Sequence, residues 1–153
     1  DLWSCNNLYW YLTHACSPVT DGLMPYREAD LLRNILDRAD AALKEGKNQA
    51  TLRFGHESCL LPLVALLELN HYGESYPDVE KLSEQWRAYD IFPMASNVQF
   101  VFFHKKGSND VLVKVLLNEK EAKLPVKTDV APYYHWKDVE SYYREKLDKY
   151  QHI

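Results

Sequence analysis

The chain has few of the residues that build a disulfide framework or a metal site. It holds three cysteines in 153 residues and no Cys-x-x-Cys pair. If the first segment is helical, Cys5 and Cys16 lie about 16 Å apart along its axis. That is farther than the separation of about 7 Å that a disulfide tolerates between Cα atoms. We therefore expect buried thiols, no disulfide, no metal and no bound cofactor.

Long apolar runs and a strong net charge are also missing. No run of about 18 apolar residues occurs, so the sequence predicts no membrane span. The formal net charge is only −4, which does not indicate a nucleic-acid partner or an anionic membrane surface. A phosphorylated small molecule stays compatible with this charge, because a local pocket binds a small anion. The hydrophobic share of 46% and the charged share of 26% are those of a globular domain that can bury a core.

Apolar residues at helical spacing predict helices over 2–16, 26–45, 58–69 and 135–149, with a short polar helix over 78–88. The helix over 26–45 has the clearest stripe, which includes Leu32, Ile35 and Leu36, and Gly46 ends it. Pro62 falls in the first turn of the third helix, where proline costs least.

The pattern changes after Pro93. Residues 97–105 alternate as a strand that we expect to be buried on both faces. A turn follows, then a returning strand over 111–117 and a third strand over 121–126, which together predict a β-meander. A single strand, Ala50–Phe54, precedes the third helix. The layout is mixed α/β: a strand–helix unit plus a β-meander with flanking helices. One strand before the hairpins is too few for a sheet, which hints that its neighbours are missing.

The segment around His56 carries the candidate chemistry. The predicted strand runs into Gly55-His56-Glu57, and a helix starts directly afterwards. In open α/β sheets ligands bind at the carboxyl ends of strands, and a helix N-terminus attracts anions. His56 could hold a phosphate oxygen and Glu57 could donate a proton. On the residues alone, a bland interpretation stays open: Glu57 favours the helix dipole and His56 caps the helix.

Arg53-Phe54-Gly55-His56 followed by Leu60-Leu61-Pro62-Leu63 resembles the second signature of the histidine acid phosphatases. The resemblance is greatest to the branch of multiple inositol polyphosphate phosphatases, which includes phytases. Further similar stretches spread it over most of the chain: Leu8 to Leu12, Val111 to Glu119 and Ala131 to Val139. It implies an incomplete histidine-phosphatase (phosphoglycerate-mutase-like) α/β sandwich, with residues 1–153 as a single C-terminal portion of that domain.

The resemblance also implies a two-step reaction. A histidine in an Arg-His-Gly-x-Arg-x-Pro motif attacks phosphorus, a carboxylic acid protonates the leaving alcohol, and water cleaves the phosphohistidine. Carried onto this chain, His56 is the second, phosphate-contacting histidine, Glu57 is the proton donor, and Arg53 is a candidate phosphate ligand. The general family has Asp directly after this histidine, and the inositol branch has His-Ala-Glu, so Glu57 departs from both patterns.

The larger departure is that Arg-His-Gly occurs nowhere in the sequence. We therefore expect the acid-donor part of a phosphomonoester hydrolase, inactive alone, whose nucleophile belongs to an N-terminal part. Its substrates would be inositol polyphosphates, and the family suggests a periplasmic or cell-surface location. Self-association or pairing with the N-terminal part would cover the unpaired strands. The alternative is a non-catalytic histidine-phosphatase-like module that binds phosphorylated ligands or a protein partner.

Overall fold

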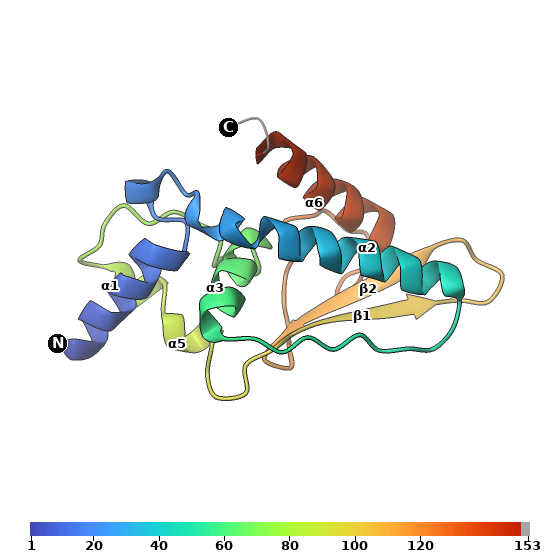
Figure 1. Cartoon of the computed structure of the whole chain (residues 1–153), viewed down its shortest axis with the longest axis horizontal. Helices are drawn as coiled ribbons and strands as arrows, with labels where there is room; N and C mark the ends of the chain where they lie inside the picture. Colours follow the sequence, from blue (N-terminus) through green and yellow to red (C-terminus); the bar gives the residue numbers. More distant parts are fainter. Residues whose placement is uncertain (151–153) are drawn as a thin grey trace.

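The computed structural model describes residues 1–150. Helices α1, α3 and α5 gather at one end of the molecule, and the hairpin of β1 and β2 extends toward the other end beside α2 and α6 (Figure 1). The elements, in order, are α1 Leu2–His14, η1 Pro18–Thr20, η2 Met24–Glu28, α2 Ala29–Glu45, α3 Glu57–Leu66, α4 Leu82–Gln85, α5 Ala88–Ile91, β1 Val98–His104, β2 Val111–Leu117, β3 Lys120–Glu121, β4 Tyr134–His135 and α6 Trp136–Tyr150.

The sheet confirms the predicted mixed α/β class and its hairpin. β1 and β2 pair antiparallel along their whole length, from Val98 opposite Leu117 to His104 opposite Val111. On its other side β2 pairs with the two short strands, β3 and β4. β1 is therefore an edge strand of this sheet. Helix α6 packs on β2 and β4, and α2 packs on α6, so both helices lie over one face.

The expectation that residues 98–103 are buried on both faces is wrong. β1 is half-buried along most of its length, and Phe103 is 41% exposed. The face that carries Phe102 meets α6, where the rings of Phe102 and Trp136 are 4.9 Å apart. On the opposite face Phe103 contacts Tyr133 from the loop before β4, at 5.1 Å between ring centroids. A helix covers one face and a loop covers only part of the other.

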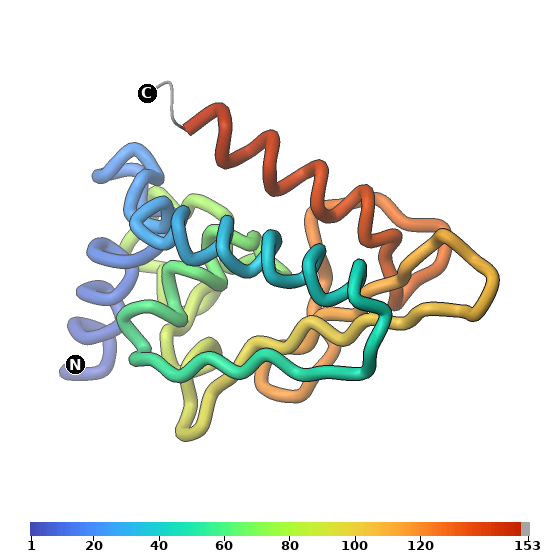
Figure 2. Tube along the Cα trace, turned by 45° about the vertical axis from the view of Figure 1, so that its right-hand side comes forward, coloured from blue at the N-terminus to red at the C-terminus, as the bar shows by residue number. Residues whose placement is uncertain are grey.

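The predicted strand Ala50–Phe54 does not form. This segment connects α2 to α3 without regular secondary structure, and Figure 2 shows it as a drawn-out path along the side of the molecule where β1 lies. Leu52 is 75% exposed and Phe54 is 94% exposed. A strand needs a neighbour for its backbone N–H and C=O groups, and no strand among residues 1–150 pairs with this segment.

The third strand of the meander is shorter than predicted because other partners take its backbone groups. After β3 only Ala122 still bonds β2, through the carbonyl oxygen of Val115 at 2.9 Å. The N–H of Lys123 then donates to the side chain of Asn70 at 2.9 Å. The N–H of Leu124 donates to the Tyr134 hydroxyl at 3.0 Å. These bonds pull the chain away from the ladder.

The predicted helix over 78–88 is divided into α4 and α5 by a buried side chain of α1. The Asn7 amide donates to the carbonyl oxygen of Trp86 at 2.9 Å and accepts from the N–H of Ala88 at 2.8 Å. Trp86 is extended at this point, with φ −137° and ψ 129°. Asn7 thus replaces the helical hydrogen bonds that the chain gives up there. Cys5 lies off the buried face of α1 and is exposed, contrary to the expected burial.

Helix α6 holds the C-terminal end of α3, an apolar helix that the sequence predicts well. The hydroxyl of Tyr143, a buried side chain, donates to the carbonyl oxygen of Leu67 at 2.8 Å. The Lys146 ammonium donates to the carbonyl oxygen of Leu66 at 2.7 Å and pairs with Glu68 at 2.8 Å. A helix C-terminus leaves carbonyl groups unbonded and favours a cation. These contacts fix α3 relative to the sheet on which α6 packs.

We expect Asn7→Ala to lower the free energy of unfolding by about 2–4 kcal/mol, because it leaves a buried C=O and a buried N–H unsatisfied. Urea denaturation followed by circular dichroism measures this loss. The exposed neighbour Asn6 supplies the control, and Asn6→Ala should change the unfolding free energy by less than about 0.5 kcal/mol. Equal effects of the two substitutions would contradict the bridging role of Asn7.

Candidate functional site

The segment singled out by the sequence lies at the N-terminus of α3. His56 is the last residue before the helix, with an extended backbone at φ −110° and ψ 163°, and Glu57 is the first helical residue. The His56 carbonyl starts the helix by accepting from the N–H groups of Cys59 at 3.0 Å and Leu60 at 3.1 Å. Both His56 and Glu57 are exposed. The helix therefore begins one residue before the predicted start at Ser58 and presents both side chains to solvent.

No side chain caps this helix. The N–H groups of Glu57 and Ser58 make no hydrogen bond within residues 1–150. The first N–H groups of a helix point along its axis and carry a partial positive charge. An anion placed there would accept from these groups directly. The local geometry is thus that of an anion cradle with His56 and Glu57 beside it.

The exposed side chain of Arg53 is held in place by a hydrogen bond to α2. Its guanidinium donates to the side-chain oxygen of Asn34 at 2.7 Å. The remaining N–H donors of Arg53 have no partner among the described residues, so they are available to an anion. Arg53 and His56 thus lie on the same connecting segment, which is exposed to solvent.

A second histidine, outside the His56 motif, lies near this site. His14 is buried at the end of α1, and α3 packs against both α1 and η2. Burial lowers the pKa of His14; the positive charge of Arg27 on η2 lowers it further, and the negative charge of Glu57 opposes both effects. His14, Arg27 and Glu57 are therefore within electrostatic reach of one another. The signal in the sequence was a histidine in line with the apolar face of its helix, close to Tyr11 and Ala15.

The hydrogen bonds of His14 fix which ring nitrogen carries its proton. The Thr13 hydroxyl donates to the carbonyl oxygen of Tyr9 at 2.7 Å, so its oxygen is left to accept. The Nδ1 atom of His14 lies 2.6 Å from that oxygen and must donate to it. In the neutral ring Nε2 is then the acceptor. Beside the site there is therefore an imidazole whose Nε2, when the ring is neutral, has no hydrogen-bond partner among the described residues.

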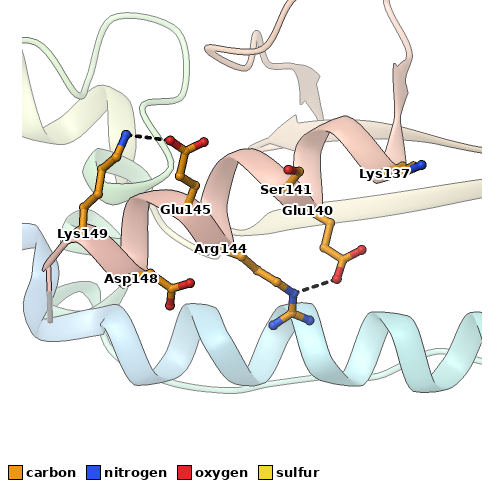
Figure 3. A pocket seen from close by; sticks show the side chains of 7 residues that line it. All are labelled: Lys137, Glu140, Ser141, Arg144, Glu145, Asp148 and Lys149. Atoms are coloured by element: carbon orange, nitrogen blue, oxygen red, sulfur yellow. Dashed lines mark hydrogen bonds and ion pairs between the residues drawn. The ribbon is translucent and has the colours of Figure 1, made fainter.

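The hollows of the surface lie elsewhere. One of about 650 Å³ is lined only by residues of α6, and Figure 3 shows their side chains projecting from that one helix. Most of its charges are paired, as in Lys149 with Glu145 at 2.7 Å, Arg144 with Glu140 at 2.7 Å and Asp148 with Arg33 of α2 at 3.3 Å. Because one convex helix with satisfied charges builds no enclosed site, we do not regard this surface as a binding pocket. A second hollow, of about 320 Å³, lies near Glu68 and Lys146 at the other end of α3.

Other kinds of site are not seen among residues 1–150. They contain no cluster of three or more His, Cys, Asp or Glu side chains arranged to hold a metal ion. Within the same residues, no helix combines the length and the apolar character needed to cross a membrane. The anion cradle at α3 is therefore the candidate site that the geometry supports.

Comparison with known families decides the classification. Residues 26–118, which include Arg53, His56 and Glu57, match the family described as histidine phosphatase superfamily (branch 2). The chain belongs to the histidine phosphatase superfamily. The resemblance of the His56 segment and its surroundings to this family is thereby confirmed.

Curated relatives in the superfamily are inositol polyphosphate phosphatases. The chain is 28% identical over 134 residues to human multiple inositol polyphosphate phosphatase 1, covering 79% of this chain and 27% of the human protein. It is 27% identical over 135 residues to the chicken protein of the same name, covering 76% of this chain and 28% of that protein. The chain thus spans about a quarter of the length of these relatives.

Solved structures of a bacterial histidine phosphatase share the fold. The Bifidobacterium longum multiple inositol polyphosphate phosphatase in complex with inositol hexasulfate superposes with a TM-score of 0.64 at 28% identity, over 74% of this chain and 25% of that one. Its apo form superposes with a TM-score of 0.76 at 24% identity, over 91% of this chain and 30% of that one. The mixed α/β arrangement described above is therefore that of a histidine phosphatase.

The proximity of His14 to Glu57 can be tested by titration. We expect NMR to give His14 a pKa below its ordinary value of 6.5, because the ring is buried. Glu57→Gln should lower the pKa of His14 further, and Arg27→Gln should raise it. Since the folded pKa is depressed, the stability contributed by neutral His14 is fully present above pH 6.5 and is lost as the pH falls through the folded pKa. A pKa that responds to neither substitution would place His14 outside the site.

Proposed function

We propose that this chain supplies the acid-donor and phosphate-binding part of a phosphomonoester hydrolase that acts on inositol polyphosphates through a phosphohistidine. The observation that carries the proposal is the uncapped N-terminus of α3, with His56 and Glu57 at the helix start and Arg53 on the segment that leads to it, inside the region that matches the superfamily. The names of the curated relatives and the inositol hexasulfate bound to the bacterial neighbour support the substrate class.

Each residue of the site has a role in this proposal. The free N–H groups of α3, the His56 ring and the Arg53 guanidinium bind the oxygens of the transferring phosphoryl group. The Glu57 carboxylic acid gives its proton to the leaving alcohol oxygen as the phosphorus–oxygen bond breaks. Asn34 holds Arg53 from α2. Water then releases phosphate from the phosphohistidine.

The nucleophile must come from outside these residues, because no Arg-His-Gly-x-Arg-x-Pro motif occurs in the sequence. That the chain spans only about a quarter of its relatives is consistent with such a division. The same observation favours a second candidate function, a non-catalytic module that binds phosphorylated ligands. The two candidates share the anion cradle and differ only in whether a nucleophile faces it.

The complete enzyme, containing this sequence together with a nucleophile part, tests the role of Glu57. We expect Glu57→Gln to lower kcat for phytate by about 100-fold or more, the usual contribution of general acid catalysis. With p-nitrophenyl phosphate the loss should be much smaller, because nitrophenolate leaves without protonation. His56→Ala should lower the activity on both substrates, since it removes a phosphate contact.

The 153-residue chain by itself is the control for this experiment and should turn over neither substrate, because it lacks the nucleophile. Ser58→Ala, beside the proposed acid, should leave the ratio of the two activities unchanged. Equal losses for both substrates in Glu57→Gln would overturn its role as the acid. Turnover by the chain alone that disappears with His56→Ala would overturn the division of the active site.

We propose further that the exposed apolar segment at Leu52 and Phe54 and the open edge of β1 pair with other polypeptide. Both lack a strand partner among the described residues, and Leu52 and Phe54 are exposed at 75% and 94%. Exposed strand edges and apolar patches recruit partners. In the complete enzyme the partner is the nucleophile part; in the isolated chain it is a second copy.

Light scattering over a range of concentrations tests this pairing. The isolated chain should change from monomer to dimer as its concentration rises, and Phe54→Ser should shift the change to higher concentration. Val19→Ser removes another strongly exposed apolar side chain, on η1, at 76% exposure, and serves as the control. A monodisperse monomer at every concentration would contradict self-association and favour the binding-module function.

A further inference from the structure

Three side chains far from the α3 site form a polar cluster that the proposed chemistry does not use. The Nδ1 atom of His135 lies 3.1 Å and 3.0 Å from the two carboxylate oxygens of Asp110. Its Nε2 atom lies 2.9 Å from a carboxylate oxygen of Asp129. The imidazole is thus held between two carboxylates, one at each ring nitrogen.

This geometry requires a charged ring. A carboxylate can only accept a hydrogen bond, and both nitrogens of an imidazole are donors only when the ring is protonated. A neutral ring would turn one lone pair toward a carboxylate. The hydrogen bonds to Asp110 and then to Asp129 raise the pKa of His135 above its ordinary value of 6.5. The bond to His135 likewise lowers the pKa of Asp129 below 3.8.

The cluster connects three parts of the fold. Asp110 immediately precedes β2, His135 ends β4 directly before α6, and Asp129 lies in the loop between β3 and β4. The other hydrogen bonds of this loop near Asp129 are internal, such as that from the Thr128 hydroxyl to the carbonyl oxygen of Tyr133 at 2.7 Å. The bond from His135 to Asp129 therefore ties the loop to the sheet.

Two other titratable groups on the neighbouring strands have partners of their own. Lys114 on β2 pairs with Glu121 at 3.4 Å. His104 on β1 lies 2.8 Å from the carbonyl oxygen of Ser108. Lys137 on α6 forms no ion pair with Asp110 or Asp129, whose ion-pair partner among the described residues is His135. The charge of the imidazole is therefore governed by Asp110 and Asp129.

We propose that Asp110, His135 and Asp129 form a proton-dependent clamp that fastens the loop over residues 127–133 to the sheet and releases it when the imidazole loses its proton. Asp110 engages Nδ1 with both oxygens and is less exposed than Asp129. The remaining proton of the neutral ring therefore stays with Asp110, and Asp129 is released. Tyr133, which contacts Phe103 on the outer face of β1, moves with the loop.

The direction of the pH dependence follows from these groups. The stability contributed by protonated His135 is fully present below pH 6.5 and is lost as the pH rises through its raised pKa. The contribution of Asp129 is present above pH 3.8 and is lost as the pH falls through its lowered pKa. The clamp is closed between these two limits.

NMR on the full chain tests the clamp. The His135 ring should titrate above pH 6.5, and Asp110→Asn and Asp129→Asn should each lower its pKa. Amide hydrogen exchange, expressed as protection factors, should show a several-fold loss of protection in residues 127–133 on raising the pH through the His135 titration. In Asp129→Asn this step should disappear, because an Asn side chain can accept a hydrogen bond from the protonated ring and donate one to the neutral ring. His104→Gln, on the same hairpin, is the control and should keep the step.

Two results would overturn the clamp. One is a His135 that titrates at or below pH 6.5. The other is equal protection of residues 127–133 on both sides of its titration. Because Asp129 is largely exposed, Asp129→Asn should fold normally, and the His135 titration in the unmodified chain needs no variant.

Discussion

The hydrogen bonds from α6 to the end of α3 determine where the candidate site lies. Tyr143 and Lys146 bond the carbonyl oxygens of Leu67 and Leu66, which α3 would otherwise leave unsatisfied. Since α6 packs on β2 and β4, these bonds fix α3 relative to the sheet. The opposite end of α3 carries His56 and Glu57. A helix held at its C-terminus and left uncapped at its N-terminus is a rigid carrier for a group that binds anions.

On one side of that helix the side chains are packed and the charges are paired. On the other side apolar side chains and backbone groups are exposed. The α6 side has buried aromatic packing and closed ion pairs, such as Arg144 with Asp40 at 2.9 Å. The side that carries the segment before α3 exposes Phe54 and leaves backbone groups without strand partners among residues 1–150. Exposed apolar surface beside an anion cradle agrees with the proposed division of the active site, because a partner that covered the surface would also enclose a bound anion.

The two histidines with shifted pKa values respond to opposite environments. His14 is buried near Arg27, which disfavours its charged form, whereas His135 lies between two carboxylates that favour it. At a pH between their two pKa values the first histidine is therefore neutral beside the candidate site, and the second holds a proton at the sheet. Acidification protonates the first and leaves the second unchanged, so the site and the loop respond to pH in different ranges.

Much of the helical framework could be predicted from the sequence. The apolar stripe of α2, its end at Gly46 and the start of α3 at Glu57 depend on local spacing and turn chemistry, which the sequence contains. The β1–β2 hairpin follows from alternation for the same reason. The division into α4 and α5 could not be predicted, because it depends on Asn7, a polar side chain about 80 residues away.

The sequence by itself determined the family resemblance, the location of His56 and Glu57 at a helix start, and the absence of the nucleophile motif. Only the tertiary structure decided that residues 50–54 do not form a strand, because a strand exists through its neighbours. Only the structure brought His14 toward Glu57 and closed Asp110 and Asp129 on His135. Spacing along the chain fixes local conformation, but contacts between distant residues arise from packing, which the linear pattern does not encode.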